Sequence, residues 1–164
     1  MKRLIVMRHA KSSWGDWELA DHDRPLNPRG KRDAPRMGKL LRNRDWTPDL
    51  IMSSTAKRAR KTAVAVAEGA GYAAEVVLTR EFYHAAPQVY LDAAVALDDT
   101  VQTVMFVGHN PGMGMLVEAL SGTFETMPTA TVAVFVLDVE QWADWDGETA
   151  QVEGIFRPKE LPNP

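Results

Sequence analysis

Short runs of apolar residues alternate along the chain with longer segments in which apolar residues recur every three or four positions. Continuous apolar runs bounded by charge or turn residues are typical of strands buried in a parallel sheet, and apolar residues at helical spacing are typical of helices that cover it. The pattern predicts strands at residues 4–7, 49–52, 75–78, 103–107, 131–138 and 152–156, and helices at residues 28–43, 55–70, 87–97 and 112–121.

Residues at the predicted helix ends agree with this assignment. Asn27 is a good N-cap with Pro28 at the first helical position, and Gly69 and Gly71 punctuate the end of the second helix. Pro35 lies inside the first helix, where we expect it to kink or weaken the helix. Strands and helices alternate with short connections, which predicts an α/β fold, a three-layer sandwich with a mostly parallel central sheet flanked by helices.

Composition narrows the class of protein. The chain has 164 residues, 45% of them hydrophobic and 25% charged, and it contains no cysteine. These values are typical of one soluble domain, here residues 1–164, and the lack of cysteine excludes disulfides, thiolate metal sites and a cysteine nucleophile. No apolar run approaches the ~20 residues that span a bilayer, and the run after the first three residues is too short for a signal peptide. We therefore expect a cytoplasmic protein with no membrane partner.

Charge is distributed unevenly along the chain. Residues 1–62 carry a net charge of +9 and residues 63–164 a net charge of −12. A basic segment favours an anionic ligand, although a solvated basic helix surface would produce the same count. The basic residues are not interleaved with stacking aromatic side chains and form no known reader motif, so nucleic acid is not expected as a partner.

Histidine and arginine follow the predicted strands at the places where ligands bind. The first strand leads directly into Arg8 and His9, and the fourth leads into Gly108 and His109. Ligands of open α/β sheets bind beyond the carboxyl ends of the strands, so we expect both imidazoles at one crevice. Arg58 lies at the start of the helix after the second strand, where free backbone N–H groups favour an anion. Two guanidinium groups converging there would bind a phosphate.

Other chemistries fit the sequence less well. A catalytic zinc site needs three protein ligands, often including closely spaced histidines, and the chain contains no His-x-His or His-Glu-x-x-His motif. The Gly-x-Ser-x-Gly elbow of serine hydrolases and the glycine-rich Walker loop are also absent from the sequence. We therefore expect no metal at this site.

Three segments resemble the histidine phosphatase superfamily, whose fold is called phosphoglycerate mutase-like. They are Arg-His-Ala at residues 8–10, Arg-Ala-x-x-Thr-Ala within residues 58–63, and Gly-His-Asn-Pro at residues 108–111, and the resemblance spans roughly residues 3–137. The Arg-His-Ala-Lys-Ser-Ser-Trp opening and Pro-Leu-Asn-Pro-Arg-Gly at residues 25–30 are most similar to the small SixA branch of phosphohistidine phosphatases. Ala10 departs from the glycine that the superfamily often has, and we expect only slightly tighter packing beside it.

The resemblance implies a phosphatase that works through a phosphohistidine intermediate on His9, without a cofactor or a metal. Neutral His9 would attack phosphorus, and Arg8, Arg58 and His109 would surround the oxygens of the phosphoryl group. A hydrolase of this kind needs no activating base for its nucleophile, because an imidazole is mostly neutral at pH 7.

The resemblance also implies an acid that protonates the leaving group shortly after the third strand. Glu81 is the candidate at that position, and a surface glutamate paired with Arg80 is the alternative interpretation. His84 could act instead. A phosphorylated imidazole leaves more readily than an alkoxide, so such a substrate would need little help from either residue.

The chain has little spare length for a lid over the site. The longest candidate is the loop at residues 11–24, so we expect an open site that suits a phosphorylated protein, such as a histidine phosphotransfer domain. A phosphatase of small phosphate esters is the alternative. A phosphoprotein-binding domain without catalysis is a third interpretation, against which the intact set of arginines and histidines argues.

Overall fold

All strands among residues 1–162, the part of the chain that the computed structural model describes, belong to one sheet. The last two residues of the predicted domain, 163–164, lie outside the described residues. The strands are β1 (Lys2–Arg8), β2 (Leu50–Ser54), β3 (Val77–Thr79), β4 (Thr103–Gly108), β5 (Val132–Leu137) and β6 (Gln151–Phe156), in the spatial order β3-β2-β4-β1-β5-β6. Strands β1 to β4 are parallel, and β5 runs antiparallel to both of its neighbours. The predicted mostly parallel sheet is confirmed.

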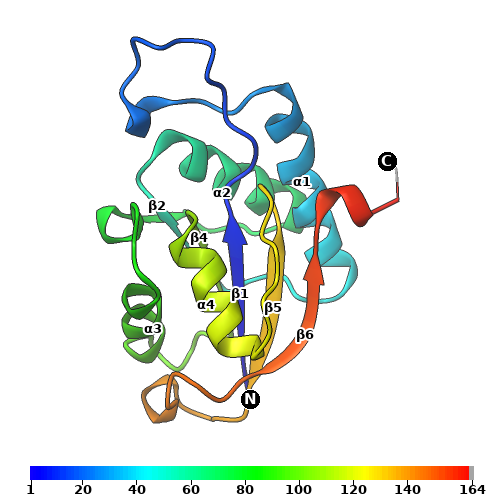
Figure 1. Cartoon of the computed structure of the whole chain (residues 1–164). Coiled ribbons are helices and arrows are strands. Elements are labelled where there is room, and N and C mark those ends of the chain that lie inside the picture. Colours follow the sequence, from blue (N-terminus) through cyan, green and yellow to red (C-terminus); the bar gives the residue numbers. More distant parts are fainter. Residues whose placement is uncertain (163–164) are drawn as a thin grey trace.

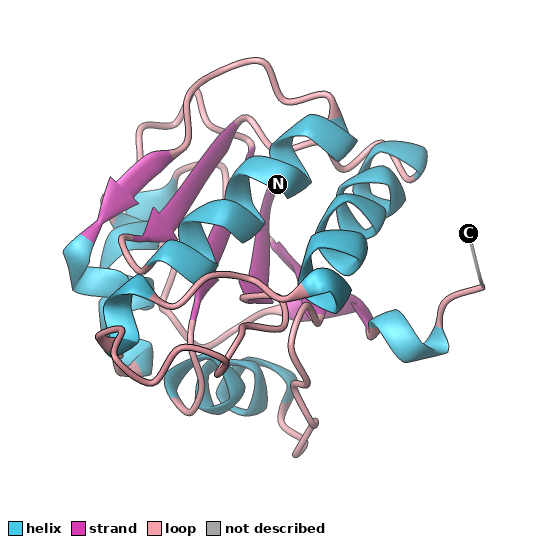
Figure 2. Cartoon of the chain, turned by 90° about the horizontal axis from the view of Figure 1, so that it is seen from above, coloured by secondary structure: helices cyan, strands magenta, loops and turns pink. Residues whose placement is uncertain are grey.

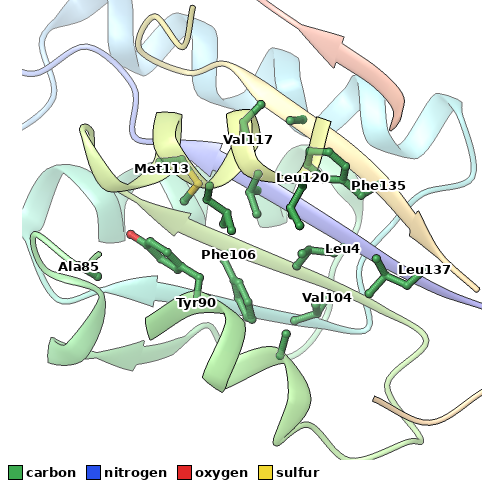
Figure 3. Close-up of a cluster of buried hydrophobic side chains, with 14 of the residues drawn as sticks. Leu4, Ala85, Tyr90, Val104, Phe106, Met113, Val117, Leu120, Phe135 and Leu137 are labelled. Atoms are coloured by element: carbon green, nitrogen blue, oxygen red, sulfur yellow. The ribbon is translucent and has the colours of Figure 1, made fainter. Parts of the chain in front are cut away.

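Helices cover both faces of the sheet (Figures 1 and 2). They are α1 (Pro28–Asn43), α2 (Lys57–Ala70), α3 (Pro87–Val95) and α4 (Gly112–Ser121). Alternate side chains of a strand point to opposite faces, so Ile5 of β1 packs in the core under α1 and α2, whereas Leu4 packs in the core under α3 and α4. Figure 3 shows the second core, where Tyr90 of α3 lies beside Phe106 of β4 and α4 contributes Met113 and Val117. The three-layer sandwich is therefore confirmed.

Helix ends agree closely with the sequence pattern, and the edge of the sheet agrees less well. Helices α1 and α4 have the predicted bounds, and the Asn27 side chain caps α1 by accepting a hydrogen bond from the Gly30 N–H at 2.9 Å. Helix α1 runs continuously through Pro35. Strand β3 is shifted by two residues at its start, and its Val77 and Leu78 are each 44% exposed. An edge strand pairs on one side only, so apolar pattern specifies its bounds weakly.

The loop after β1, residues 11–27, arches above the carboxyl end of that strand (Figure 1) and contains a short 3₁₀ turn at Asp21–Asp23. An isolated bridge between Ser12 and Leu26 and a hydrogen bond from the Asn27 N–H to the Lys11 carbonyl join its two ends. The loop therefore returns beside β1 before α1 begins. Within residues 1–162, none of the helices has the length and apolar character needed to cross a membrane.

Candidate active site

Adjacent parallel strands bring two histidines to the same edge of the sheet. Arg8 at the end of β1 lies opposite Gly108 at the end of β4, and the His9 N–H donates to the Gly108 carbonyl at 3.0 Å. The ring centroids of His9 and His109 are 5.2 Å apart, as the matched strand ends predict. Position 108 requires glycine, because a Cβ there would lie 2.0 Å from the Tyr90 hydroxyl.

A cavity of about 260 Å³ opens at this edge. Its lining contains Arg8, His9, Arg58 and His109, which are the four residues that sequence analysis assigned to phosphate binding. The cavity is also lined by residues that sequence analysis did not assign to the site, and among them Lys11, Asp21 and Arg24 carry charge. Three arginines and a lysine against one carboxylate give the cavity a net positive charge, which suits a phosphate dianion.

The hydrogen bonds around His9 determine which of its ring nitrogens is free to react. Nδ1 lies 2.8 Å from the Ala10 carbonyl oxygen, which can only accept, so Nδ1 carries the hydrogen and Nε2 carries the lone pair. The Ala10 N–H donates to Thr62 Oγ1 at 2.9 Å, and that hydroxyl donates to the Arg58 carbonyl at 2.7 Å. Burial, with Arg58 and Arg8 adding to it, lowers the pKa of His9 to about 3. The ring is therefore neutral and nucleophilic at neutral pH.

The hydrogen bond between His109 and Ser54 indicates which ring nitrogen of His109 carries its hydrogen. Its Nε2 lies 2.8 Å from Ser54 Oγ, which accepts a hydrogen bond from the Ala56 N–H at 3.1 Å and can therefore donate its own hydrogen to Nε2. Burial, with the neighbouring His9 and Arg58 adding to it, lowers the pKa of His109 to about 2. A neutral imidazole that accepts at Nε2 carries its hydrogen on Nδ1.

Two buried donors at the cavity have no protein partner in the described part of the chain. They are Nδ1 of His109 and Nε of Arg8, whose Nη1 donates to the Met127 carbonyl at 3.1 Å. Buried polar groups without partners are uncommon in native proteins. Both donors belong to side chains that line the cavity and are left unused by the rest of residues 1–162.

Asp21, from the loop after β1, holds two of the arginines. Arg58 donates from Nη1 to the Asp21 carbonyl at 2.7 Å and from Nη2 to Oδ2 at 3.0 Å, and Arg24 donates to Oδ1 at 3.0 Å. Burial opposes ionisation of Asp21, but hydrogen bonds from Tyr83 and Arg58 outweigh it and hold the pKa of this carboxyl well below its usual range. The Arg24 guanidinium also stacks 3.3 Å from the ring of Trp14. Asp21 is therefore an ionised anchor for the cationic wall.

The two candidates for the acid lie in different environments. Glu81 is exposed, is absent from the cavity lining, and makes its hydrogen bond through its backbone N–H to Thr79 Oγ1. It belongs to a 3₁₀ turn, Arg80–Phe82, in which Phe82 is buried and Glu81 faces solvent. His84 lines the cavity, with its ring centroid 5.3 Å from that of His109. The structure does not bring Glu81 to the paired histidines.

Sequence reasoning missed Asp21, Arg24 and Tyr83. Asp21 and Arg24 lie in a loop with no hydrophobic period, so pattern could not orient their side chains. The available signal was the dense charge of Asp-His-Asp-Arg at residues 21–24 in the one long loop near the expected site. Within residues 1–162 no three His, Asp or Glu side chains are grouped so that they could hold a metal ion.

Comparisons with known proteins agree with this geometry. The family model of the histidine phosphatase superfamily (branch 1) matches residues 4–83. The chain is 32% identical to a protein of Agrobacterium tumefaciens assigned as the phosphohistidine phosphatase SixA, whose crystal structure superposes with a TM-score of 0.82 over 96% of this chain and 98% of that one. It is also 35% identical to an uncharacterized protein of Mycobacterium tuberculosis over 93% of this chain and 100% of that protein.

A further solved structure, the protein histidine phosphatase SixA complexed with tungstate, has a TM-score of 0.84 at 20% identity and covers 98% of this chain. That likeness concerns the fold alone. The A. tumefaciens relative is similar to this chain in both fold and sequence, over nearly the whole length of each. The chain belongs to the histidine phosphatase superfamily and is a SixA-like phosphatase.

Proposed function

We propose that this protein is a protein phosphohistidine phosphatase that acts through a phosphohistidine intermediate on His9. The observation that carries the proposal is the hydrogen bond between Nδ1 of His9 and the Ala10 carbonyl, which leaves the Nε2 lone pair on a neutral ring in a cationic cavity. Nε2 attacks phosphorus in line with the leaving group, so the P–N bond forms as the bond to the leaving group breaks. Water then attacks the phosphorus on His9 and releases inorganic phosphate.

Arg8, Arg58 and His109 stabilise the charge that this transfer spreads over the phosphoryl oxygens. The three side chains already line the cavity, and Asp21 holds Arg58 in place, so little reorganisation is needed during the reaction. Nδ1–H of His109 and Nε–H of Arg8 have no protein partner among residues 1–162, so the protein itself leaves both donors unused. Because the guanidinium groups supply the positive charge, we include no metal or cofactor in the mechanism.

The expected substrate is a phosphorylated protein of the cytoplasm, such as a histidine phosphotransfer domain. Trp14 lines the cavity yet is 72% exposed, and Trp17 on the same loop is 87% exposed. Exposed tryptophans beside a site are typical of surfaces that contact another protein. The SixA name of the A. tumefaciens relative points in the same direction. Small phosphate esters are the alternative substrates, and the exposed tryptophans favour the protein.

The test combines a substrate panel with trapping of the intermediate. Catalytic efficiency is compared for a phosphohistidine protein, a phosphoserine peptide, a sugar phosphate and 4-nitrophenyl phosphate, and we expect the phosphohistidine protein to rank first. Brief exposure to ³²P-labelled substrate should give acid-labile, base-stable label on the wild type. His109→Asn should turn over slowly and still acquire label, whereas His9→Asn should acquire none. Label retained in His9→Asn would place the nucleophile elsewhere, and a binder without catalysis would show no turnover of any substrate.

A further inference from the structure

The cavity has a buried floor and an exposed rim. His9, Arg58 and His109 on the floor are 6%, 3% and 2% exposed, whereas the side chains of Asp21 and His84 at the rim are 41% and 54% exposed. A nucleophile on the floor that attacks in line drives the leaving group outward, toward the rim. The groups that meet the departing atom are therefore those of the rim.

His84 is held at this rim in an unusual backbone conformation. Its φ is +53°, in the left-handed region that only a few per cent of residues other than glycine adopt, with asparagine, aspartate and histidine the most frequent among them. Such a conformation persists only where neighbouring structure imposes it, and it clusters at functional sites. Here the next residue is fixed, because the Ala85 carbonyl packs so close to Gly112 that a Cβ on Gly112 would lie 1.8 Å from it. The ring of the preceding residue, Tyr83, lies 4.1 Å from the His84 ring.

A fixed carboxylate faces the His84 ring. Oδ2 of Asp21 lies 3.3 Å from Nε2 of His84, and the same oxygen accepts hydrogen bonds from the Tyr83 hydroxyl at 2.6 Å and from Arg58. The carboxylate therefore cannot move away without breaking its bonds to Arg58 and Tyr83. A carboxylate that orients an imidazole is a recurrent arrangement where histidine transfers protons.

We propose that His84 is the catalytic residue that protonates the leaving group, and that Asp21 is the positioning residue that orients it. This inference rests on the proposed function and deepens it. As Nε2 of His9 forms its P–N bond, the bond from phosphorus to the leaving atom breaks, and that atom, a ring nitrogen of phosphohistidine or the oxygen of an ester, takes a proton from the His84 imidazolium. In the second half, water attacks phosphorus, the P–N electrons return to His9, and neutral His84 accepts the proton that water loses. Both histidines are then restored.

The experiment varies the leaving group. Benzyl phosphate expels an alkoxide, a strong base that depends on an acid, whereas 4-nitrophenyl phosphate expels a weak base that does not. His84→Asn keeps the left-handed conformation, because asparagine tolerates it. We expect this variant to lose on the order of 10²–10⁴-fold in kcat/KM for benzyl phosphate and only a few-fold for 4-nitrophenyl phosphate. Glu81→Gln is the matched variant of the other candidate, and it should leave both values unchanged.

Two further variants separate the acid from a structural role. His84→Gly also accepts a positive φ, and added imidazole should restore its activity toward benzyl phosphate without raising that toward 4-nitrophenyl phosphate. Asp21→Asn should lower kcat/KM for both substrates, because Asp21 also holds Arg58. The loss should be larger for benzyl phosphate than for 4-nitrophenyl phosphate. Equal losses on the two substrates in His84→Asn, or a selective benzyl phosphate loss in Glu81→Gln, would overturn the assignment of His84 and leave the proposed function standing. No turnover of any substrate by the wild type, the phosphohistidine protein included, would overturn both.

Discussion

Thr62 links the first turns of α2 to the nucleophile, and replacing it tests how the site is held. Its Oγ1 accepts the Ala10 N–H at 2.9 Å and donates to the Arg58 carbonyl at 2.7 Å, and both Thr62 and Ala10 are fully buried. The Ala10 carbonyl in turn accepts from Nδ1 of His9. Thr62→Val keeps the shape of the side chain and removes the oxygen, so the Ala10 N–H becomes a buried donor without a partner.

The expected loss in free energy of unfolding comes from the unpaired Ala10 N–H. Leaving a buried N–H unsatisfied costs about 1–3 kcal/mol, whereas the Arg58 carbonyl loses little because it also accepts within the helix. One kcal/mol shifts the melting temperature of a domain of this size by about 2–4 °C. We therefore expect Thr62→Val to melt about 2–12 °C below the wild type. Because the Ala10 peptide orients His9, kcat should also fall by about 10-fold or more.

The assay pairs thermal unfolding with turnover of 4-nitrophenyl phosphate, and Thr62→Ser is the matched control. Serine keeps the hydroxyl and removes one methyl group, a loss of about 1 kcal/mol. It should therefore retain kcat close to the wild-type value. If Thr62→Val is as stable and as active as Thr62→Ser, the hydrogen bond to Ala10 does not position the nucleophile.

Two other predictions concern protons and metals. Stability should fall as pH is lowered from 8 to 5, because the pKa values of about 3 for His9 and about 2 for His109 lie below the ~6.5 of an unfolded histidine, so the unfolded chain takes up protons first. The loss in free energy of unfolding should be roughly 2 kcal/mol per histidine at pH 5. The urea midpoint of a His9→Asn/His109→Asn double variant should therefore depend less on pH over this range. If the urea midpoints of the variant and the wild type depend on pH in the same way, the two histidines do not have lowered pKa values. Activity should survive EDTA, because the arginines carry the charge a metal would supply; a loss restored by Zn²⁺ or Mg²⁺ would refute this.

The sequence by itself determined the order of the elements and four residues of the candidate site, three at strand ends and one at a helix start. Buried parallel strands appear as short apolar runs, and helices appear as a 3.6-residue period, so these signals are local and survive without knowledge of the fold. The alternation of strands and helices predicts a parallel sheet, and the residues that follow parallel strands lie at the same edge of that sheet. Arg8, His9 and His109 could be assigned to one site for this reason, and Arg58 could be assigned because it starts a helix.

Only the tertiary structure decided which rim residues reach the cavity. Glu81 and His84 are three positions apart, and the 3₁₀ turn that contains Glu81 directs it to solvent while the left-handed backbone of residue 84 brings its imidazole inward. Asp21 joins Arg58 across 37 residues and Tyr83 across 62 residues. Such contacts depend on how a loop without periodicity packs against two other segments, and no local pattern of hydrophobic and polar residues records that packing.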